Sequence, residues 1–91
     1  MPSAFASLEI REILLYRLMK EGFHVRMHGY EYFIRRRGKF VCVVVLYPAW
    51  SSAHIHKISW NSQESEEAIQ VISKVLREMD PNLNLKVIST Q

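Results

Sequence analysis

The sequence predicts an α+β domain with the element order α-β-β-β-β-α-β, in which one mixed sheet is flanked by two helices. Two segments near the ends of the chain carry apolar residues at helical spacing, and the segments between them alternate or run continuously apolar. Gly or Pro stands at several of the junctions, as is typical of turns. The 91 residues, 48% of them hydrophobic and 23% charged, are expected to form a single domain spanning residues 1–91.

Residues 5–21 are expected to form the first helix, which ends where Gly22 takes a left-handed cap and Phe23 folds back on the last turn. The apolar residues of this helix occupy two adjoining sides, with Ile10, Leu14 and Leu18 on one and Leu8, Leu15 and Met19 on the other. One small sheet offers a helix only one face. The surplus therefore indicates that the helix is sandwiched within its own fold or packed on a second molecule, most simply in a symmetric dimer.

Four strands are expected to follow this helix. In the first, Phe23, Val25 and Met27 alternate with His24, Arg26 and His28, so the second set is predicted to face away from the core. Residues 30–35 alternate weakly and lead through a basic turn into Phe40–Tyr47. That third strand is apolar on both faces, as expected of a central strand covered on both sides. Pro48 ends it, and His54–Trp60 is the predicted fourth strand.

A second helix and a last strand complete the chain. Asn61 and Glu64 have the spacing of a capping box, and Asp80-Pro81-Asn82 is expected to end the helix. Residues 83–89 form the final predicted strand. The apolar face of the helix consists of Ala68, Ile69, Ile72, Val75, Leu76 and Met79.

The composition excludes several classes of protein. The first five residues contain no basic region ahead of an apolar core, so no signal peptide is expected. The longest apolar run, Phe40–Tyr47, is far shorter than the about 20 residues that span a bilayer. Cys42 is the only cysteine, so neither an intrachain disulfide nor a thiolate metal cluster is expected. We therefore expect a cytoplasmic protein with no membrane partner.

The element order, the Gly-Phe helix stop, the basic hairpin and the wholly apolar third strand resemble the restriction-endonuclease-like group of folds. The stretches Leu15–Arg26 and Ile58–Trp60 are similar to the helix, Gly-aromatic turn and later Ser-Trp of the catalytic domain of tRNA-splicing endonucleases. The first helix and its Gly-Phe turn are also similar to archaeal Holliday-junction resolvases. These resemblances imply a nucleic-acid partner. The resemblance to tRNA-splicing endonucleases also implies a place in tRNA processing.

The positions that carry catalysis in these two families hold other residues here. In the splicing-endonuclease pattern, the Tyr position holds His28, the His position falls at about Arg37, and the Lys position falls near Asp80-Pro81. In the resolvase pattern, the positions of the metal-binding carboxylates and the Lys hold Tyr32, Val45 and Tyr47. Metal-assisted hydrolysis requires oxygen ligands that these residues do not supply. We expect no catalytic residue and no nuclease activity.

Two further features carry groups that are capable of metal binding or nucleophilic chemistry. His54 and His56 lie on the same side of a strand, and His24 and His28 add two more imidazoles that suit zinc, copper or nickel. Histidines on a partly exposed sheet face are the preferred interpretation, because no cysteine accompanies them. Cys42 lies in an apolar strand, where a thiol is usually an inert small hydrophobe. There is no Gly-rich phosphate loop and no nucleophile motif, so neither a cofactor nor a metal is expected.

The charge is uneven along the chain. Residues 22–60 carry six basic side chains against Glu31, a net of +5, whereas residues 61–91 carry a net of −2. A basic surface of this kind favours phosphates. We therefore predict a non-catalytic nucleic-acid-binding module or accessory subunit, with an assembly protein that binds no nucleic acid as the alternative. A double-stranded-RNA-binding domain fits less well, because its second helix begins with basic residues and this one begins with acidic ones. The predicted phosphate contacts are Arg35, Arg36, Arg37 and Lys39, with Arg26 and Lys57 extending the patch.

Overall fold

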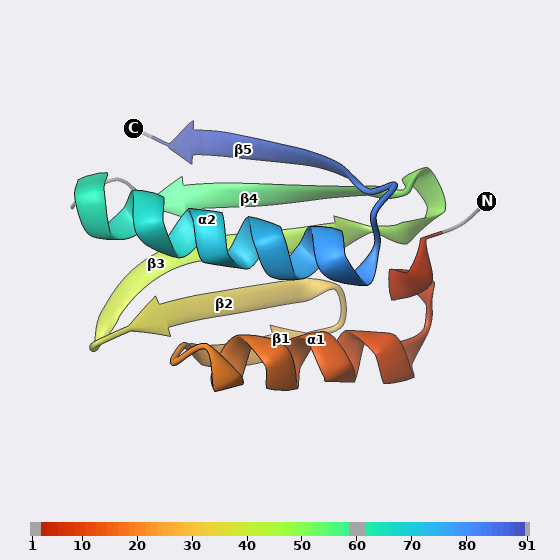
Figure 1. The fold of residues 1–91 in the computed structure, drawn as a ribbon, viewed down its shortest axis with the longest axis horizontal. Coiled ribbons are helices and arrows are strands. Elements are labelled where there is room, and N and C mark those ends of the chain that lie inside the picture. Colours follow the sequence, from red (N-terminus) through yellow and green to blue (C-terminus); the bar gives the residue numbers. More distant parts are fainter. Residues whose placement is uncertain (1–2, 59–61, 91) are drawn as a thin grey trace.

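The computed structural model describes residues 3–58 and 62–90, and within them the chain forms two α-helices and one five-stranded sheet. The order of these elements is α-β-β-β-β-α-β, so the predicted class and order are confirmed. Figure 1 shows both helices in front of the sheet. The elements are η1 (Ala4–Ala6), α1 (Leu8–Lys20), β1 (His24–His28), β2 (Glu31–Arg36), β3 (Lys39–Tyr47), η2 (Pro48–Trp50), β4 (Ser52–Ile58), α2 (Ser62–Met79) and β5 (Asn84–Thr90), where η denotes a short 3-10 helix.

Helix α1 begins later than residue 5 because two serines cap separate helical segments. The hydroxyl of Ser3 accepts a hydrogen bond from the amide of Phe5, which starts η1. The hydroxyl of Ser7 accepts one from the amide of Ile10, which starts α1. Since serine oxygens satisfy the amides that a helix leaves unpaired at its start, the two caps divide the predicted helix in two.

The end of α1 agrees with the prediction. Gly22 has a φ of +94°, and its amide donates to the carbonyl of Met19. The amide of Phe23 donates to the carbonyl of Leu18, which completes the double hydrogen bond of a Schellman cap. Phe23 and Leu18 are both buried, so the cap also inserts an aromatic ring into the core.

The sheet is ordered β1-β2-β3-β4-β5, with the first four strands antiparallel in sequence and β5 parallel to β4. A parallel neighbour requires a long crossover, and α2 provides it. The turn between β2 and β3 consists of Arg37 and Gly38, which have φ of +52° and +76°. Positive φ at both central residues is typical of the type I′ turn, whose twist suits a hairpin.

A β-bulge interrupts the pairing of β2 with β3. Ile34 is opposite Cys42, whereas the next residue, Arg35, is opposite Phe40, so Val41 has no partner of its own. Val41 and Cys42 are therefore both buried although they are adjacent. The extra residue also places the side chains of Phe40 and Arg35 on the same face of the sheet.

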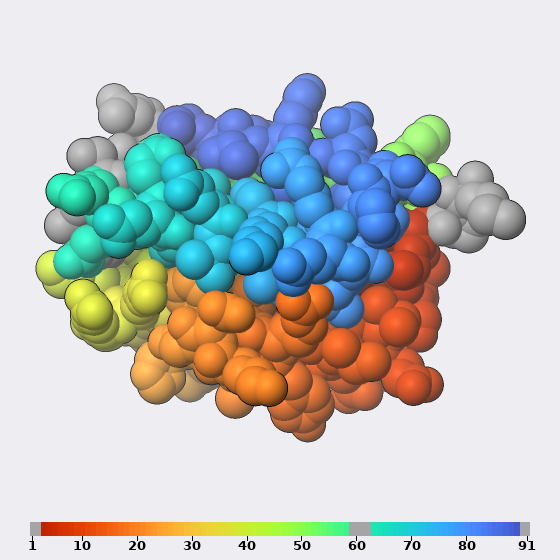
Figure 2. Space-filling model, viewed as in Figure 1, coloured from red at the N-terminus to blue at the C-terminus, as the bar shows by residue number. Residues whose placement is uncertain are grey.

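Both helices pack on one face of the sheet, and no described helix covers the other face. In the view of Figure 2 their side chains form a continuous layer in front of the sheet. This corrects the expectation that Phe40–Tyr47 is covered on both sides. Val44 is buried beneath the helices, but Val43 and Val45 are only half-buried on the uncovered face. The same alternation holds in β4, where Ala53, Ile55 and Lys57 are buried and His54, His56 and Ile58 are partly exposed.

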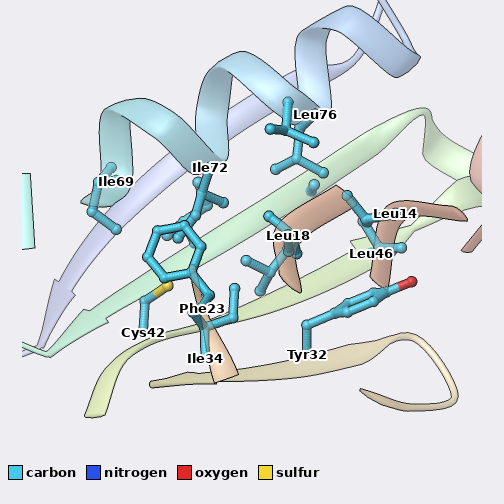
Figure 3. Close-up of a cluster of buried hydrophobic side chains, with 14 of the residues drawn as sticks. Leu14, Leu18, Phe23, Tyr32, Ile34, Cys42, Leu46, Ile69, Ile72 and Leu76 are labelled. Carbon is cyan, nitrogen blue, oxygen red and sulfur yellow. The ribbon is translucent and has the colours of Figure 1, made fainter. Parts of the chain in front are cut away.

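The core lies between the two helices and the covered face of the sheet. Figure 3 shows side chains of α1 and α2 pointing toward those of β2 and β3. Tyr32 fits this apolar layer because its hydroxyl donates a hydrogen bond of 2.8 Å to the carbonyl of Arg11. Each aliphatic side chain that becomes fully buried there contributes about 1.5–3 kcal/mol. Fully buried members include Leu14, Leu18, Ile34, Ile55, Ile72 and Leu76.

Two predicted features, the Asn61 helix cap and the end of the fourth strand at Trp60, lie outside the described residues. In the described parts of the chain, no helix is both long enough and apolar enough to cross a lipid bilayer.

Candidate nucleic-acid interface

The uncovered face of the sheet collects side chains from all of its described strands. Paired residues of neighbouring strands lie on the same face, so the register arranges these side chains in rows. Three rows result: His24–Arg35–Phe40, then Arg26–Phe33–Val43–His56–Ile88, and then His28–Glu31–Val45–His54–Lys86. The face thus combines aromatic rings, imidazoles and cations.

A groove of about 780 Å³ lies at the β1 edge of the sheet, beside the β2–β3 turn, and its lining includes Met19, Phe23 and Val25 as well as residues of the uncovered face. Arg26 and Arg35 contribute positive charge to it, and Phe33 and Phe40 contribute aromatic surface. A guanidinium group binds a phosphate through two parallel hydrogen bonds, and an aromatic ring stacks on a nucleic-acid base. The lining therefore carries both kinds of group that nucleic-acid binding uses.

The aromatic rings of the groove hold one another in place. Phe33 and Phe40 meet edge to face, with ring centroids 6.4 Å apart and an interplanar angle of 89°. His28 meets Phe33 in the same way at 5.6 Å. The guanidinium of Arg35 lies 6.0 Å from the centre of the Phe40 ring and donates to the carbonyl of Gly38. These contacts orient the side chains that line the groove before any ligand is bound.

A second, smaller hollow of about 230 Å³ lies at the other end of β3, lined by Tyr47, Trp50, Ser52 and His54. The rings of Tyr47 and His54 are 4.8 Å apart. Trp50, in η2, is 80% exposed. Because the β3–β4 connection is short, η2 holds this indole beside the sheet. The proximity of Trp50 to Tyr47 and His54 depends on the geometry of this turn.

The structure brings most of the predicted basic residues to the groove end of the sheet. Arg26 and Arg35 lie on the uncovered face, and Arg37 is exposed at the adjoining turn. Lys39 is exposed too, but it is paired with Arg36 and so belongs to the other face. Arg36 extends to the opposite face, where its guanidinium lies 5.1 Å from the centre of the Phe23 ring. The basic turn therefore distributes its cations on both sides of the sheet.

Lys57 does not extend this patch, contrary to what the sequence led us to expect. It lies beneath α2 with 8% of its surface exposed, and its ammonium group forms an ion pair with Glu66. The sequence could have predicted this burial, because side chains alternate along a strand and Lys57 is an even number of residues from the buried Ala53 and Ile55. In its place the register adds Lys86 of β5, which lies opposite His54 and was not among the predicted contacts.

All four histidines of the chain lie on the uncovered face. His54 and His56 are neighbours, with ring centroids 6.0 Å apart, as their spacing predicted. Among the described residues, no cluster of three or more His, Cys, Asp or Glu side chains has the arrangement of a metal site.

The positions that the resolvase pattern assigns to metal-binding carboxylates and Lys hold Tyr32, Val45 and Tyr47, none of which is a carboxylate. Tyr32 lies in the core, where burial raises the pKa of its hydroxyl and the nearby Arg11 partly offsets this. Val45 and Tyr47 lie on the uncovered face. Burial raises the pKa of the Cys42 thiol to about 12. Both the Tyr32 hydroxyl and the Cys42 thiol are therefore neutral near pH 7.

None of the family models, curated proteins or solved structures with which the chain was compared matches it. The resemblance to restriction-endonuclease-like folds therefore stays a prediction.

Proposed function

We propose that this protein is a non-catalytic nucleic-acid-binding module, acting as an accessory or structural subunit. One observation carries the proposal: Arg26 of β1 and Arg35 of β2 both line one groove, and Arg37 is exposed at the turn beside it. Cations from separate segments of the sequence thus gather at one end of the uncovered face. A cluster of this kind attracts the phosphates of a nucleic acid.

The proposed contacts are to the phosphate backbone. Such contacts orient a protein on nucleic acid and carry little sequence information. Each phosphate that a cation neutralises releases counterions, so the logarithm of the affinity falls linearly with the logarithm of the salt concentration. The number of ionic contacts is therefore measurable from the salt dependence of binding.

The test is a titration of labelled DNA and RNA, both single- and double-stranded, at several salt concentrations. The variant Arg26→Ala/Arg35→Ala/Arg37→Ala is expected to bind more weakly and with a flatter salt dependence. The slope should fall by about 0.9 per lost contact on duplex DNA and about 0.7 on a single strand. Arg36 is left unchanged because it packs on Phe23 in the folded protein.

A matched control removes the same number of positive charges from the helix-covered side of the molecule. Lys20→Ala/Lys74→Ala/Arg77→Ala also removes three positive charges, at exposed positions of α1 and α2. This control should keep the wild-type slope. Wild-type protein that binds none of the nucleic acids at low salt refutes the proposed function. Equal loss in both triple variants refutes the assignment of the site and leaves only a non-specific charge effect.

A second candidate function is self-association through α1. This helix leaves Leu8, Ile13, Tyr16 and Met19 exposed, and Tyr16 is 68% exposed. Leu14 and Leu18 are buried in the core, so the apolar surplus predicted from the sequence divides between the core and the surface. Apolar side chains gathered on an exposed helix face are typical of protein–protein interfaces.

The charges on the exposed side of α1 fit a second copy of the same helix. Glu9 and Glu12 lie in its first half, and Lys20 lies at its end. Two copies packed antiparallel about a two-fold axis bring the acidic half of each opposite the basic end of the other. Met19 also lines the groove, so such a dimer reaches its α1 side but leaves Arg26 and Arg35 on the uncovered face accessible.

A further inference from the structure

The aromatic surface of the uncovered face is distributed along β3. Phe33 and Phe40 lie at the groove, and Tyr47, Trp50 and His54 lie at the second hollow. The seven residue steps from Phe40 to Tyr47 correspond to about 23 Å of extended strand. Aromatic rings therefore lie near both ends of β3, and a ligand that contacts both sets extends along this strand.

The surface between the two ring clusters is largely apolar and is not covered by any described helix. Val43 and Val45 are half-buried there, flanked by His56. Arg26 lies at one side of this strip and Lys86 at the other. A ligand that matches this strip carries negative charge near Arg26 and Lys86, away from the carboxylate of Glu31 opposite Val45, and also presents flat, weakly polar faces. Nucleic-acid bases on a phosphate backbone have both properties.

The width of the sheet distinguishes a duplex from a single strand. Five described strands at spacings of about 4.8 Å make the face about 19 Å wide. The major groove of B-DNA is about 12 Å wide and admits a helix or a two-stranded ribbon. The sheet face therefore cannot enter it, and the bases of a duplex are stacked and out of reach of the rings. Only the β2–β3 turn is narrow enough to enter a groove.

We infer that the uncovered face binds a single strand of nucleic acid, which runs along β3 with unpaired bases on the aromatic rings. Arg26 and Arg35 bind phosphates at the groove, and Trp50 stacks on a base at the other end. The strip of about 23 Å accommodates roughly seven nucleotides at the 3.4 Å spacing of a stacked strand, and fewer when the strand is extended. This inference rests on the proposed function, which leaves the form of the nucleic acid open.

The test compares one sequence as a single strand and as a duplex, in DNA and in RNA, with wild-type protein and two aromatic variants. Trp50→Ala removes an exposed ring on the uncovered side, and Tyr30→Ala removes an exposed ring that lies against Arg11 of α1 on the covered side. We expect the single strand to bind more tightly than the duplex. Trp50→Ala should weaken single-strand binding by about 5- to 100-fold, the effect of losing one stacked base, and Tyr30→Ala should not change it.

Two further measurements test the geometry. In a Trp60→Phe background, Trp50 is the remaining tryptophan, and its fluorescence should be quenched by single strands but not by duplexes. With oligothymidylates of about 4, 8 and 16 nucleotides, affinity per molecule should rise steeply from the shortest to the middle length and little beyond it. Phe40→Leu, which keeps apolar volume in the groove, should also weaken single-strand binding.

The outcomes separate the two proposals. Binding of neither single strand nor duplex removes the proposed function and this inference together. Tighter binding of the duplex, with Trp50→Ala unchanged and the Arg26/Arg35/Arg37 variant weakened, overturns the single-strand inference and leaves the proposed function standing. Unchanged binding by both Trp50→Ala and Phe40→Leu contradicts the stacking contacts even if the single strand is preferred. A difference between DNA and RNA identifies which of the two the strip accommodates.

Discussion

Lys57 and Glu66 form an ion pair that joins β4 to the first turns of α2. The two partners differ in environment, since the Lys57 side chain is 10% exposed and that of Glu66 is 57% exposed. Burial of an ammonium group is unfavourable unless its charge is compensated. The carboxylate of Glu66 therefore contributes chiefly by compensating the charge of Lys57.

This asymmetry predicts different effects for the two partners. Glu66→Gln leaves the buried ammonium without its carboxylate and should destabilise the protein by about 1 kcal/mol, since water still screens the exposed partner. Lys57→Met removes the buried charge, keeps the apolar volume, and should change stability less. Urea unfolding of both variants measures the difference. A larger loss for Lys57→Met than for Glu66→Gln contradicts this account.

Lys57→Met also tests the nucleic-acid site. The ammonium lies beneath α2, on the side opposite the groove, so its removal should leave nucleic-acid affinity unchanged. Arg26→Met removes one positive charge from the uncovered face and should weaken binding. If the two variants lose affinity equally, the position of the charge is irrelevant and the groove is not the site.

The misplacement of Lys57 shows what the sequence pattern can and cannot determine. The alternation of burial in β4 is visible in the sequence, and it places residue 57 with Ala53 and Ile55. A basic residue near other basic residues nonetheless suggested a common patch. Basic residues that are close in the sequence are easily seen, but the face of the sheet on which each one lies depends on strand alternation and register. The element order needed only periodicity and turn residues, so it was predictable.

Other features needed the three-dimensional structure. An apolar strand such as Phe40–Tyr47 is expected to be covered on both faces, but apolar residues also line a binding surface. Periodicity does not distinguish these two cases. The bulge at Val41 shifts the register by one residue and brings Phe40 beside Arg35. No residue type in this segment predicts the bulge. The groove therefore could not be assembled from the sequence.

The buried thiol of Cys42 predicts a dependence of stability on alkaline pH. Its pKa is raised by burial from 9.0 to about 12, so between these values the unfolded chain loses a proton that the folded chain keeps. The unfolded state then binds fewer protons, and stability falls as pH rises. The thiol's contribution is intact below pH 9 and should decrease by about 1 kcal/mol at pH 10.

Unfolding of wild type and Cys42→Ala from pH 8 to pH 10.5, a range set by these pKa values, measures this contribution. Cys42→Ala should be less stable throughout and should lose less stability as pH rises. Tyr32→Phe provides the contrast, because burial of the Tyr32 hydroxyl affects only the range above pH 10. The native thiol should also react slowly with a thiol reagent at pH 8 and rapidly after unfolding. Parallel pH profiles for wild type and Cys42→Ala contradict the raised pKa.

We expect no metal-dependent cleavage of nucleic acid. The hydroxyl of Tyr32 is engaged with the carbonyl of Arg11 in the core, and Val45 offers no oxygen ligand. Purified protein incubated with labelled DNA and RNA and with Mg²⁺ or Mn²⁺ should leave both intact. Cleavage that co-purifies with the protein and is abolished by a substitution on the uncovered face would overturn this expectation and the non-catalytic assignment with it.

The exposed side of α1 predicts a homodimer whose strength depends on the arrangement of its charges. Tyr16 lies near the middle of the exposed apolar residues, so Tyr16→Arg introduces like charges close to the two-fold axis and should shift the protein to the monomer. Sedimentation equilibrium over a range of protein concentrations measures the dissociation constant. The matched control is Trp50→Arg, which makes the same type of change at an exposed ring on the other side of the molecule.

Charge reversal tests the antiparallel orientation itself. Glu9→Lys/Glu12→Lys places positive charges opposite Lys20 of the second copy, and Lys20→Glu places negative charges opposite Glu9 and Glu12. Each variant should dissociate more readily by a few-fold, since exposed pairs contribute about 0.2–1 kcal/mol. Combining all three substitutions restores opposite charges and should recover the wild-type dissociation constant. If the combined variant is weaker than either parent, the helices do not pack antiparallel. A wild type that stays monomeric at the highest concentration leaves α1 with no role in self-association.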